Sequence, residues 1–314
     1  MGETRIIESV KELSKEEYLL KGHIACAGCG PAIALRLLFK ALGKKVILVV
    51  PACCSSVIPG SYPYTSFAVP VQNIIFEATG ATASGVVAAL RKRGVKDVTV
   101  VGWAGDGGTF DIGIQALSGA AERGTNFIYI CYDNEAYGNT GVQRSGATPY
   151  GAWTTTTPTG KKERKKDMAF IMAAHRIPYV ATACPSYPMD FIRKLRKAKE
   201  IEGTRFIHLL APCPTGWRYD TSKTVDIGRL AVQTGTWVLF EIEHGKFKLN
   251  PPSDQLIEKA KRKPVKEYLT LQGRFRKLTE DDIEKTQKWI DEDWERYRKL
   301  ASNSASELPL YGKI

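Results

Sequence analysis

The chain has 314 residues, a hydrophobic content of 43% and a formal net charge of +12. This length and composition are ordinary for one large or two smaller globular domains with a sizeable buried core. The positive charge would suit an anionic cofactor or an acidic partner. No nucleic-acid motif accompanies it, so we expect no nucleic-acid partner, and we interpret the densest basic run, 161–166, as a solvated face.

The N-terminal region contains no hydrophobic signal core, and the apolar run at Ile47 to Val50 is too short to span a membrane. We therefore expect a cytoplasmic protein with no membrane partner. In that compartment the seven cysteines are not expected to form structural disulfides. Cysteines that cluster would instead indicate metal or redox chemistry.

The N-terminal part of the chain predicts two helices and a strand. Ser14 and Glu17 match a capping box, so a helix is expected to begin there. A second helix is expected over 32–42, because Pro31 suits its first turn. The apolar residues 45–50 predict the strand.

Two cysteine-bearing loops flank the second helix and its strand. Cys26 and Cys29 form a Cys-x-x-Cys-Gly pattern before the helix, and Cys53 and Cys54 follow the strand. A Cys-x-x-Cys pair fits a redox dithiol, a zinc site or an iron–sulfur cluster. Irregular spacing and a distant further cysteine, Cys213, favour the cluster, with one of the adjacent pair reaching it. The residues alone leave all three possibilities open.

Residues 98–134 predict a βαβ unit. Its parts are a strand, a glycine-rich break, a helix and a second strand (98–102, 105–108, 110–122 and 127–132). Ligands of open α/β sheets bind at the carboxyl ends of the strands. Asp106 and Asn134 fall at those ends. Before this unit, Ser61 to Pro70 is expected as a lid or subunit-contact loop, and 79–93 as a helix.

The glycine-rich break indicates diphosphate binding through a divalent cation. Glycines let the backbone approach a phosphate closely. Asp106 offers an anionic oxygen and Asn134 a neutral one, and Mg²⁺ prefers such ligands. The alternative is a tight turn with a capping aspartate. The pattern GDGG followed by Asn at the end of the next strand resembles the thiamine diphosphate motif.

The rest of the chain continues the α/β pattern and then changes character. A long threonine-containing loop is expected over 146–160, and a hairpin and a long amphipathic helix close the chain. The elements expected are 168–175 (helix), 179–183 (strand), 189–201 (helix), 206–210 (strand), 237–242 and 246–249 (hairpin) and 278–300 (helix).

Taken together, the motifs resemble the β subunit of a thiamine-diphosphate-dependent 2-oxoacid:ferredoxin oxidoreductase. The resemblance covers about His23 to Trp217. It is carried by CAGCG, PACCSS, GDGG, YDNEAYGNTGVQRS, TPYGAWTTTTP and APCPTGW. It implies an α/β thiamine-diphosphate-binding fold, with a mostly parallel sheet flanked by helices and a helical C-terminal extension. We expect a cofactor and iron–sulfur domain over 1–240 and a hairpin and helical extension over 241–314.

The resemblance also implies three cofactors: thiamine diphosphate, Mg²⁺ and one [4Fe–4S] cluster. It assigns the cluster to Cys26, Cys29, Cys54 and Cys213. It assigns magnesium to Asp106, Asn134 and the backbone carbonyl of Ala136. The cofactor-binding residues that it implies are Gly105, Asp106, Gly107, Gly108, Asn134, Ala136 and Asn139. Asn139 matches an asparagine near the thiazolium ring, where it could stabilise a developing oxyanion.

The implied activity is oxidative decarboxylation of a 2-oxoacid, with electrons passed through the cluster to ferredoxin. Pyruvate is the first choice of substrate, and branched-chain 2-oxoacids, 2-oxoglutarate and oxalate are alternatives. Coenzyme A is expected as a co-substrate of the complex. Thiamine enzymes also need a carboxylate against the aminopyrimidine ring. Neither Glu77 nor Glu135 matches it, so other subunits are expected to supply it, together with ferredoxin-like clusters.

Two other classes of function stay open. A non-oxidative thiamine-diphosphate decarboxylase would explain GDGG and Asn134 but would leave four cysteines without a role. A zinc-stabilised binding module would explain the cysteines but not GDGG.

Overall fold

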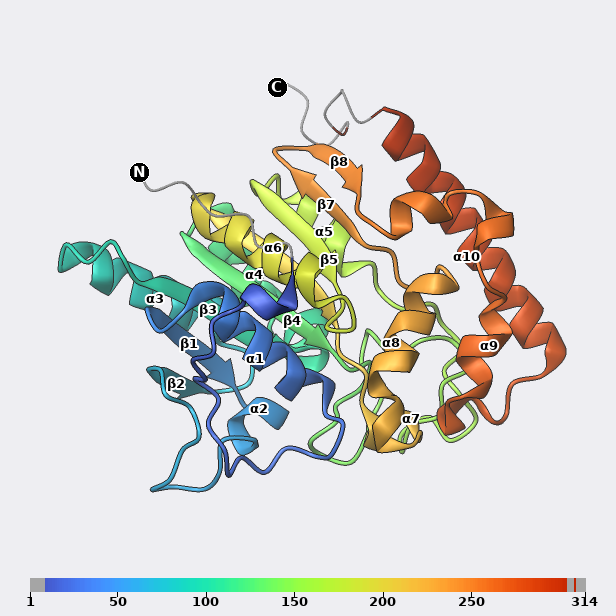
Figure 1. Ribbon diagram of the computed structural model, residues 1–314, viewed down its shortest axis with the longest axis horizontal. Coiled ribbons are helices and arrows are strands. Elements are labelled where there is room, and N and C mark those ends of the chain that lie inside the picture. Colours follow the sequence, from blue (N-terminus) through green and yellow to red (C-terminus); the bar gives the residue numbers. More distant parts are fainter. Residues whose placement is uncertain (1–8, 304–307, 309–314) are drawn as a thin grey trace.

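The computed structural model of the chain describes residues 9–303 and residue 308. Its centre is an eight-stranded sheet with the strand order β2-β1-β3-β4-β6-β5-β7-β8 (Figure 1). The first six of these strands are parallel, and the β7–β8 hairpin is antiparallel. The strands are β1 Val46–Pro51, β2 Val71–Ile74, β3 Thr99–Gly105, β4 Phe127–Asp133, β5 Tyr179–Ala183, β6 Thr204–Leu210, β7 Phe240–Glu243 and β8 Lys246–Leu249.

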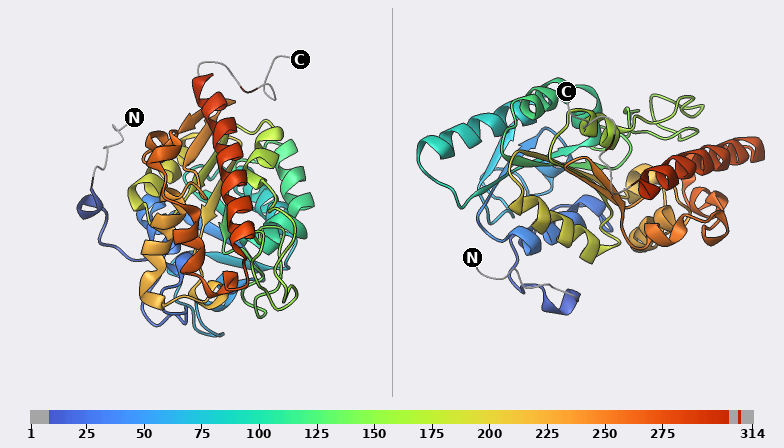
Figure 2. Two further views of the ribbon diagram at one scale, coloured as in Figure 1. Left: turned by 90° about the vertical axis from the view of Figure 1, so that its right-hand side faces the viewer. Right: turned by 90° about the horizontal axis from the view of Figure 1, so that it is seen from above.

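Helices cover both faces of the sheet. Helices α1 and α6 pack together on one face, and α3, α4 and α5 lie on the other (Figure 2). The bounds of the helices are α1 Gly30–Leu42, α2 Cys54–Val57, α3 Thr79–Lys92, α4 Ile114–Glu122, α5 Met168–Ala174, α6 Pro188–Glu200, α7 Pro214–Trp217, α8 Thr224–Gln233, α9 Val265–Thr270 and α10 Glu280–Ser302. The expected α/β class, with a mostly parallel sheet between helices, is confirmed.

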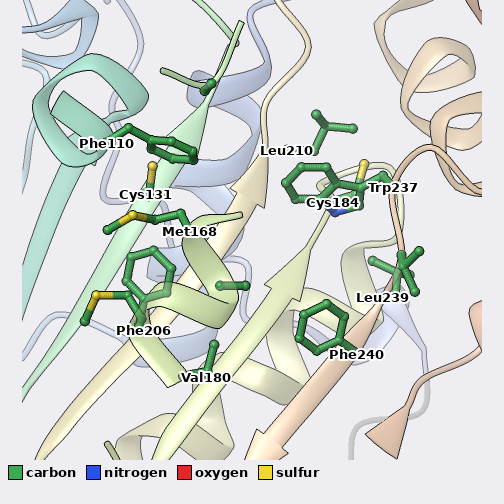
Figure 3. Packing of buried hydrophobic residues seen from close by; sticks show 14 of the residues in the cluster. Phe110, Cys131, Met168, Val180, Cys184, Phe206, Leu210, Trp237, Leu239 and Phe240 are labelled. Carbon is green, nitrogen blue, oxygen red and sulfur yellow. The ribbon is translucent and has the colours of Figure 1, made fainter. Parts of the chain in front are cut away.

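Strand β4 shows why the centre of the sheet forms. All seven of its residues are buried. Alternate side chains, such as Tyr129 and Ile130, enter the two hydrophobic cores on opposite faces. A parallel strand covered on both faces is apolar throughout because neither face meets water. Figure 3 shows Cys131 from this strand and Cys184 among apolar side chains, so both are small core residues.

The predicted helix at Ser14 is wrong. Only a single 3-10 turn, Val10–Glu12, occurs nearby. The chain then runs extended, with hydrogen bonds from Leu20 N to Ser66 O and from Ala68 N to Tyr18 O. Glu17 pairs with Arg36 of α1 instead of capping a helix. The backbone groups of this segment therefore form hydrogen bonds with distant residues, and the local capping pattern does not start a helix.

The helix predicted from residue 110 is interrupted near its start. A π-helical turn, Gly107–Asp111, comes first, and α4 begins at Ile114. Gly113 lies between them, where an added Cβ would come within 2.0 Å of Gly108 O. The interruption keeps the glycine-rich loop folded tightly at the end of β3.

The C-terminal part adds the hairpin and helices α8, α9 and α10 beside the sheet (Figure 1). The capping box at the start of α10 forms as expected, because Thr279 Oγ1 accepts from Asp282 N and Asp282 Oδ2 accepts from Thr279 N. The division proposed between residues 240 and 241 falls inside β7. Residues 1–8, 304–307 and 309–314 of the two proposed units lie outside the described residues. Among the described helices none is long and apolar enough to cross a membrane.

Candidate cofactor site

A cavity of about 200 Å³ opens at the carboxyl ends of β1, β3 and β4. This is the edge at which open α/β sheets bind their ligands. The three loops that follow these strands supply nearly all of its lining. The lining residues are Ala52, Cys53, Cys54, Phe76, Gly105, Asp106, Gly107, Gly108, Tyr132, Asn134, Ala136, Tyr137, Gly138, Asn139 and Thr140. All seven residues expected to bind the cofactor are therefore brought together here.

Three oxygen-bearing groups converge within this cavity. The side-chain amide of Asn134, oriented so that its nitrogen donates, bonds Ala136 O at 2.7 Å and Asp106 Oδ1 at 3.0 Å. With the amide oxygen turned inward instead, the three groups would present oxygens to a cation. Octahedral ligands at about 2.1 Å from Mg²⁺ lie about 3 Å apart. The donor set and its spacing thus fit a magnesium ion.

The surroundings of the Asp106 carboxylate would favour a positively charged ligand. Asp106 is buried, and burial together with the charge of Asp133 raises the pKa of Asp106 well above its ordinary value. Ser145 acts in the opposite direction, because its Oγ donates a hydrogen bond of 2.5 Å to Oδ2 of Asp106. A bound dication would offset the remaining cost of the buried charge.

Close neighbours constrain two glycines of the loop. A Cβ on Gly107 would come within 2.3 Å of the Tyr137 ring. A Cβ on Gly108 would come within 3.2 Å of Phe76. The Phe76 and Tyr137 rings themselves meet edge to face, with centroids 5.9 Å apart. These aromatic rings close one side of the cavity. A side chain at residue 107 would force the Tyr137 ring to move, and one at residue 108 would press on Phe76.

Glu135 lies between two of the converging groups in a left-handed conformation, with φ of 64°. This conformation costs a non-glycine residue on the order of 1 kcal/mol. The buried Glu135 carboxylate pairs with Lys165 Nζ at 2.8 Å and with Arg274 Nη2 at 2.6 Å. The ion pairs hold the strained turn and occupy the carboxylate. Glu77 is exposed, and it does not line the cavity.

A second layer of polar groups supports the turn. Lys165 Nζ also lies 3.0 Å from Asp133 Oδ2, which in turn lies 2.8 Å from His208 Nε2. Burial alone would lower the pKa of Lys165, but the charges of Asp133 and Glu135 outweigh it and raise the pKa. Lys165 is therefore charged at neutral pH. It holds the end of β4 and the residue after Asn134 in one ion-pair network.

The predicted cluster cysteines come from three loops, which carry Cys26 and Cys29, Cys54, and Cys213. Cys54 lines the cavity, and its Sγ would lie 3.4 Å from a Cβ on Gly138. Cys26, Cys29 and Cys213 lie outside the cavity lining. The loop of Cys26 and Cys29 joins the loop of Cys213 through a hydrogen bond of 3.1 Å from Gly30 N to Pro212 O.

These thiols raise one another's pKa values. Burial raises the pKa of Cys29 to about 12, with a further contribution from Cys213 and Cys26. Burial also raises the pKa of Cys54, and Cys213, Cys53 and Cys29 add to it. Burial likewise raises the pKa of Cys53, while hydrogen bonds with Tyr132 and Ser55 lower it. Within residues 9–303 and 308, no group of three or more His, Cys, Asp or Glu side chains is close enough to hold a single metal ion.

Several residues that support the site were not identified from the sequence. Ser145 Oγ bonds Asp106, and Thr148 Oγ1 donates to Glu135 O at 2.7 Å. The two side chains are linked, since Ser145 N donates to Thr148 Oγ1 at 2.9 Å. One turn thus ties the end of β3 to the end of β4. Its only signal in the sequence was its place within the motif that ends in Ser145.

Comparisons with known proteins give the context of this geometry. Residues 59–209 match the family model described as thiamine pyrophosphate enzyme, C-terminal TPP binding domain. The chain is 55% identical over 296 residues to the ketoisovalerate oxidoreductase subunit VorB of Pyrococcus furiosus, covering 91% of this chain and 94% of that subunit. It is 54% identical over 285 residues to the pyruvate synthase subunit PorB of Methanothermobacter marburgensis, covering 89% and 97%.

A solved structure shares the fold. The 2-oxoglutarate:ferredoxin oxidoreductase from Magnetococcus marinus, with 2-oxoglutarate, coenzyme A and succinyl-CoA bound, matches with a TM-score of 0.56 and 23% identity. The match covers 71% of this chain and 84% of that chain. At this identity the likeness concerns the fold.

Proposed function

Because this chain belongs to the family of 2-oxoacid:ferredoxin oxidoreductase β subunits, we propose that it holds thiamine diphosphate through Mg²⁺ beside one [4Fe–4S] cluster. The observation that supports this proposal most directly is that Gly138 lies between the Asn134 side chain and the Cys54 thiol. A Cβ there would lie 3.0 Å from the Asn134 side chain and 3.4 Å from Cys54 Sγ. The proposed magnesium ligand and the proposed cluster ligand therefore adjoin across one small residue.

The chain's own residues would bind and orient the cofactor. Asp106, Asn134 and the Ala136 carbonyl would hold Mg²⁺, and the loop Gly105 to Gly108 would accept the diphosphate. When bound, thiamine diphosphate supplies the carbanion chemistry that removes CO₂ from a 2-oxoacid. Asn139, which lines the same cavity, would donate a hydrogen bond to oxygen that gains negative charge.

The cluster would be held by the four cysteines Cys26, Cys29, Cys54 and Cys213. Its role is to accept electrons and pass them towards ferredoxin, the acceptor that we propose. Cys53 is left out of the set, because the family resemblance assigns the second cysteine of the adjacent pair, Cys54. The raised pKa values of Cys29 and Cys54 mean that these thiols must lose protons when iron binds.

Other subunits would complete the active site. Glu135 is paired and Glu77 lies outside the cavity, so we propose that a partner supplies the carboxylate for the aminopyrimidine ring. Ferredoxin-like clusters and the use of coenzyme A would also belong to the complex. Tyr62 and Tyr64 are 97% and 80% exposed in the predicted contact loop, which supports a partner surface there. A cytoplasmic location and the division at residue 240 stay part of this proposal.

Pyruvate remains our first choice of substrate, with branched-chain 2-oxoacids, 2-oxoglutarate and oxalate as alternatives. The proposal is tested with the anaerobically purified complex, assayed for reduction of ferredoxin with each acid in turn. We expect reduction that requires thiamine diphosphate and Mg²⁺ and is fastest with pyruvate. Decarboxylation without ferredoxin reduction would contradict the oxidative role, and a faster rate with 2-ketoisovalerate would overturn the choice of pyruvate.

A further inference from the structure

Arg274 belongs to the C-terminal extension, yet its side chain reaches the candidate cofactor site. It is 3% exposed, and no feature of its sequence neighbourhood indicated a role. Its Nε donates to Gln272 Oε1 at 2.9 Å, and its backbone oxygen accepts from Trp153 N at 2.8 Å. These two hydrogen bonds fix the orientation of the Arg274 side chain relative to the site.

The guanidinium makes two contacts that lead to different halves of the site. Its Nη2 lies 2.6 Å from Glu135 Oε2, in the strained turn between Asn134 and Ala136. Its Cζ lies 4.0 Å from the centroid of the Trp217 ring. A planar guanidinium presents a rigid fork of donors to a carboxylate and a flat face to an aromatic ring, whereas an ammonium acts as a point charge.

Trp217 connects the same two regions. Its Nε1 donates to Asn134 O at 2.7 Å. It also ends α7, the short helix whose N-cap is Cys213, and its backbone N donates to Cys213 O at 2.8 Å. The side chain of Arg274 therefore lies against both the turn that carries Asn134 and the turn that carries Cys213.

We propose that Arg274 is a positioning residue, which fixes the magnesium-binding turn and the Cys213 turn relative to each other and places a positive charge beside the cluster. This inference rests on the proposed function, because it takes Asn134 as a magnesium ligand and Cys213 as a cluster ligand. The charge lies near the Cys213 turn, since the guanidinium lies 4.0 Å from the ring of Trp217, whose backbone N donates to Cys213 O. A cation near a cluster favours its reduced, more negative state.

The test compares Arg274→Met, Arg274→Lys and the control Arg276→Met in the assembled complex. Arg276 is two residues away and exposed. The measurements are the dissociation constant of thiamine diphosphate at saturating Mg²⁺ and the midpoint potential of the cluster. We expect Arg274→Met to weaken cofactor binding by about 10–100-fold and to lower the midpoint potential. Arg274→Lys should weaken cofactor binding but keep the potential near that of the wild type, and the control should change neither.

A complex with Arg274→Met that keeps both the wild-type affinity and the wild-type potential would overturn the inference. If that variant does not assemble, Arg274→Lys decides, because wild-type cofactor affinity in it would also overturn the positioning role. Cys213→Ser and Asp106→Asn are measured in parallel. Full iron in Cys213→Ser would show that the proposed cluster site is wrong. Loss of iron in Cys213→Ser with no effect of Arg274→Met would reject the inference alone.

Discussion

The hydroxyl of Ser145 donates a hydrogen bond of 2.5 Å to Oδ2 of Asp106, at the end of β3. This contact lowers the pKa of a carboxyl group that burial raises. It also leaves Oδ1 of Asp106 facing the Asn134 side chain, 3.0 Å away. Ser145 therefore opposes the effect of burial on Asp106 and fixes the orientation of its carboxyl group.

We predict that Ser145→Ala weakens Mg²⁺-dependent binding of thiamine diphosphate by about tenfold or more, as expected for groups that orient a metal ligand. Asp106→Asn should abolish binding with the fold retained. Calorimetric titration measures both. The matched control is Ser222→Ala, because Ser222 Oγ donates to Asp220 Oδ1 at 2.6 Å on the exposed surface. Equal affinities in Ser145→Ala and in the control would show that Ser145 does not support the site.

A substitution in the glycine loop should lower the affinity for the cofactor, whereas a glycine substitution elsewhere should not. In Gly107→Ala the new Cβ would meet the Tyr137 ring at 2.3 Å, so the ring must move and open the cavity. We predict weaker cofactor binding than in the wild type. Gly85→Ala is the control, because it lies in α3 with nothing within 4 Å of the new Cβ. It should keep cofactor affinity and raise stability by about 0.5–1 kcal/mol. Unchanged affinity in Gly107→Ala would contradict the steric account.

The sequence predicted most of the sheet because buried parallel strands carry continuous apolar runs, as in β4. Strand β2 was missed, since it is short and its Gln72 and Asn73 are exposed. Helix α8 was missed although its signal was present: Ile227, Gly228, Ala231 and Val232 are buried at helical spacing.

For the candidate site, the meeting of the GDGG loop with Asn134 followed from one rule, that parallel strands end at the same edge. The supporting contacts did not follow from any local pattern. Arg274 and Glu135 lie 139 positions apart in the chain. The sequence around either residue gives no indication that the two side chains form an ion pair. Contacts of this kind depend on the tertiary path of the chain.

Lys161 gives the structure a dependence on pH. The interpretation of 161–166 as a solvated face is wrong at Lys161, which is 2% exposed and whose Nζ donates to Thr148 O at 2.6 Å. Burial lowers the pKa of Lys161 to about 8. Above about pH 8 the folded protein has released the Lys161 proton. In the unfolded chain the pKa of a lysine is about 10.4, so the proton is still bound there. Stability from this group therefore rises from about pH 8 to about pH 10.

The comparison of Lys161→Met with the wild type isolates this effect from other titrating groups. We predict that the stability of the variant relative to the wild type falls as pH rises from about 8 to about 10, by at most a few kcal/mol. Thermal or urea unfolding at a series of pH values measures it. Lys162→Met serves as the control, because Lys162 is exposed. A difference that is constant with pH would show that Lys161 titrates normally in the folded protein.

The chain alone should lack the activating carboxylate. Proton exchange at C2 of thiamine diphosphate should be slow in the isolated chain loaded with Mg²⁺ and fast in the whole complex, because Glu135 is held by Lys165 and Arg274. NMR after mixing with deuterated water measures the exchange. Fast exchange in the isolated chain would place the carboxylate here, and Glu77→Gln and Glu135→Gln would then identify it.

The central claim is that one cluster lies beside the cofactor on Cys26, Cys29, Cys54 and Cys213. The most direct test is the iron content and visible absorption of the chain purified without oxygen, for the wild type, Cys53→Ser and Cys54→Ser. We predict a brown protein with about four irons per chain in the wild type and in Cys53→Ser, and a clear loss of iron in Cys54→Ser. A colourless wild-type chain, or iron lost in Cys53→Ser and kept in Cys54→Ser, would contradict it.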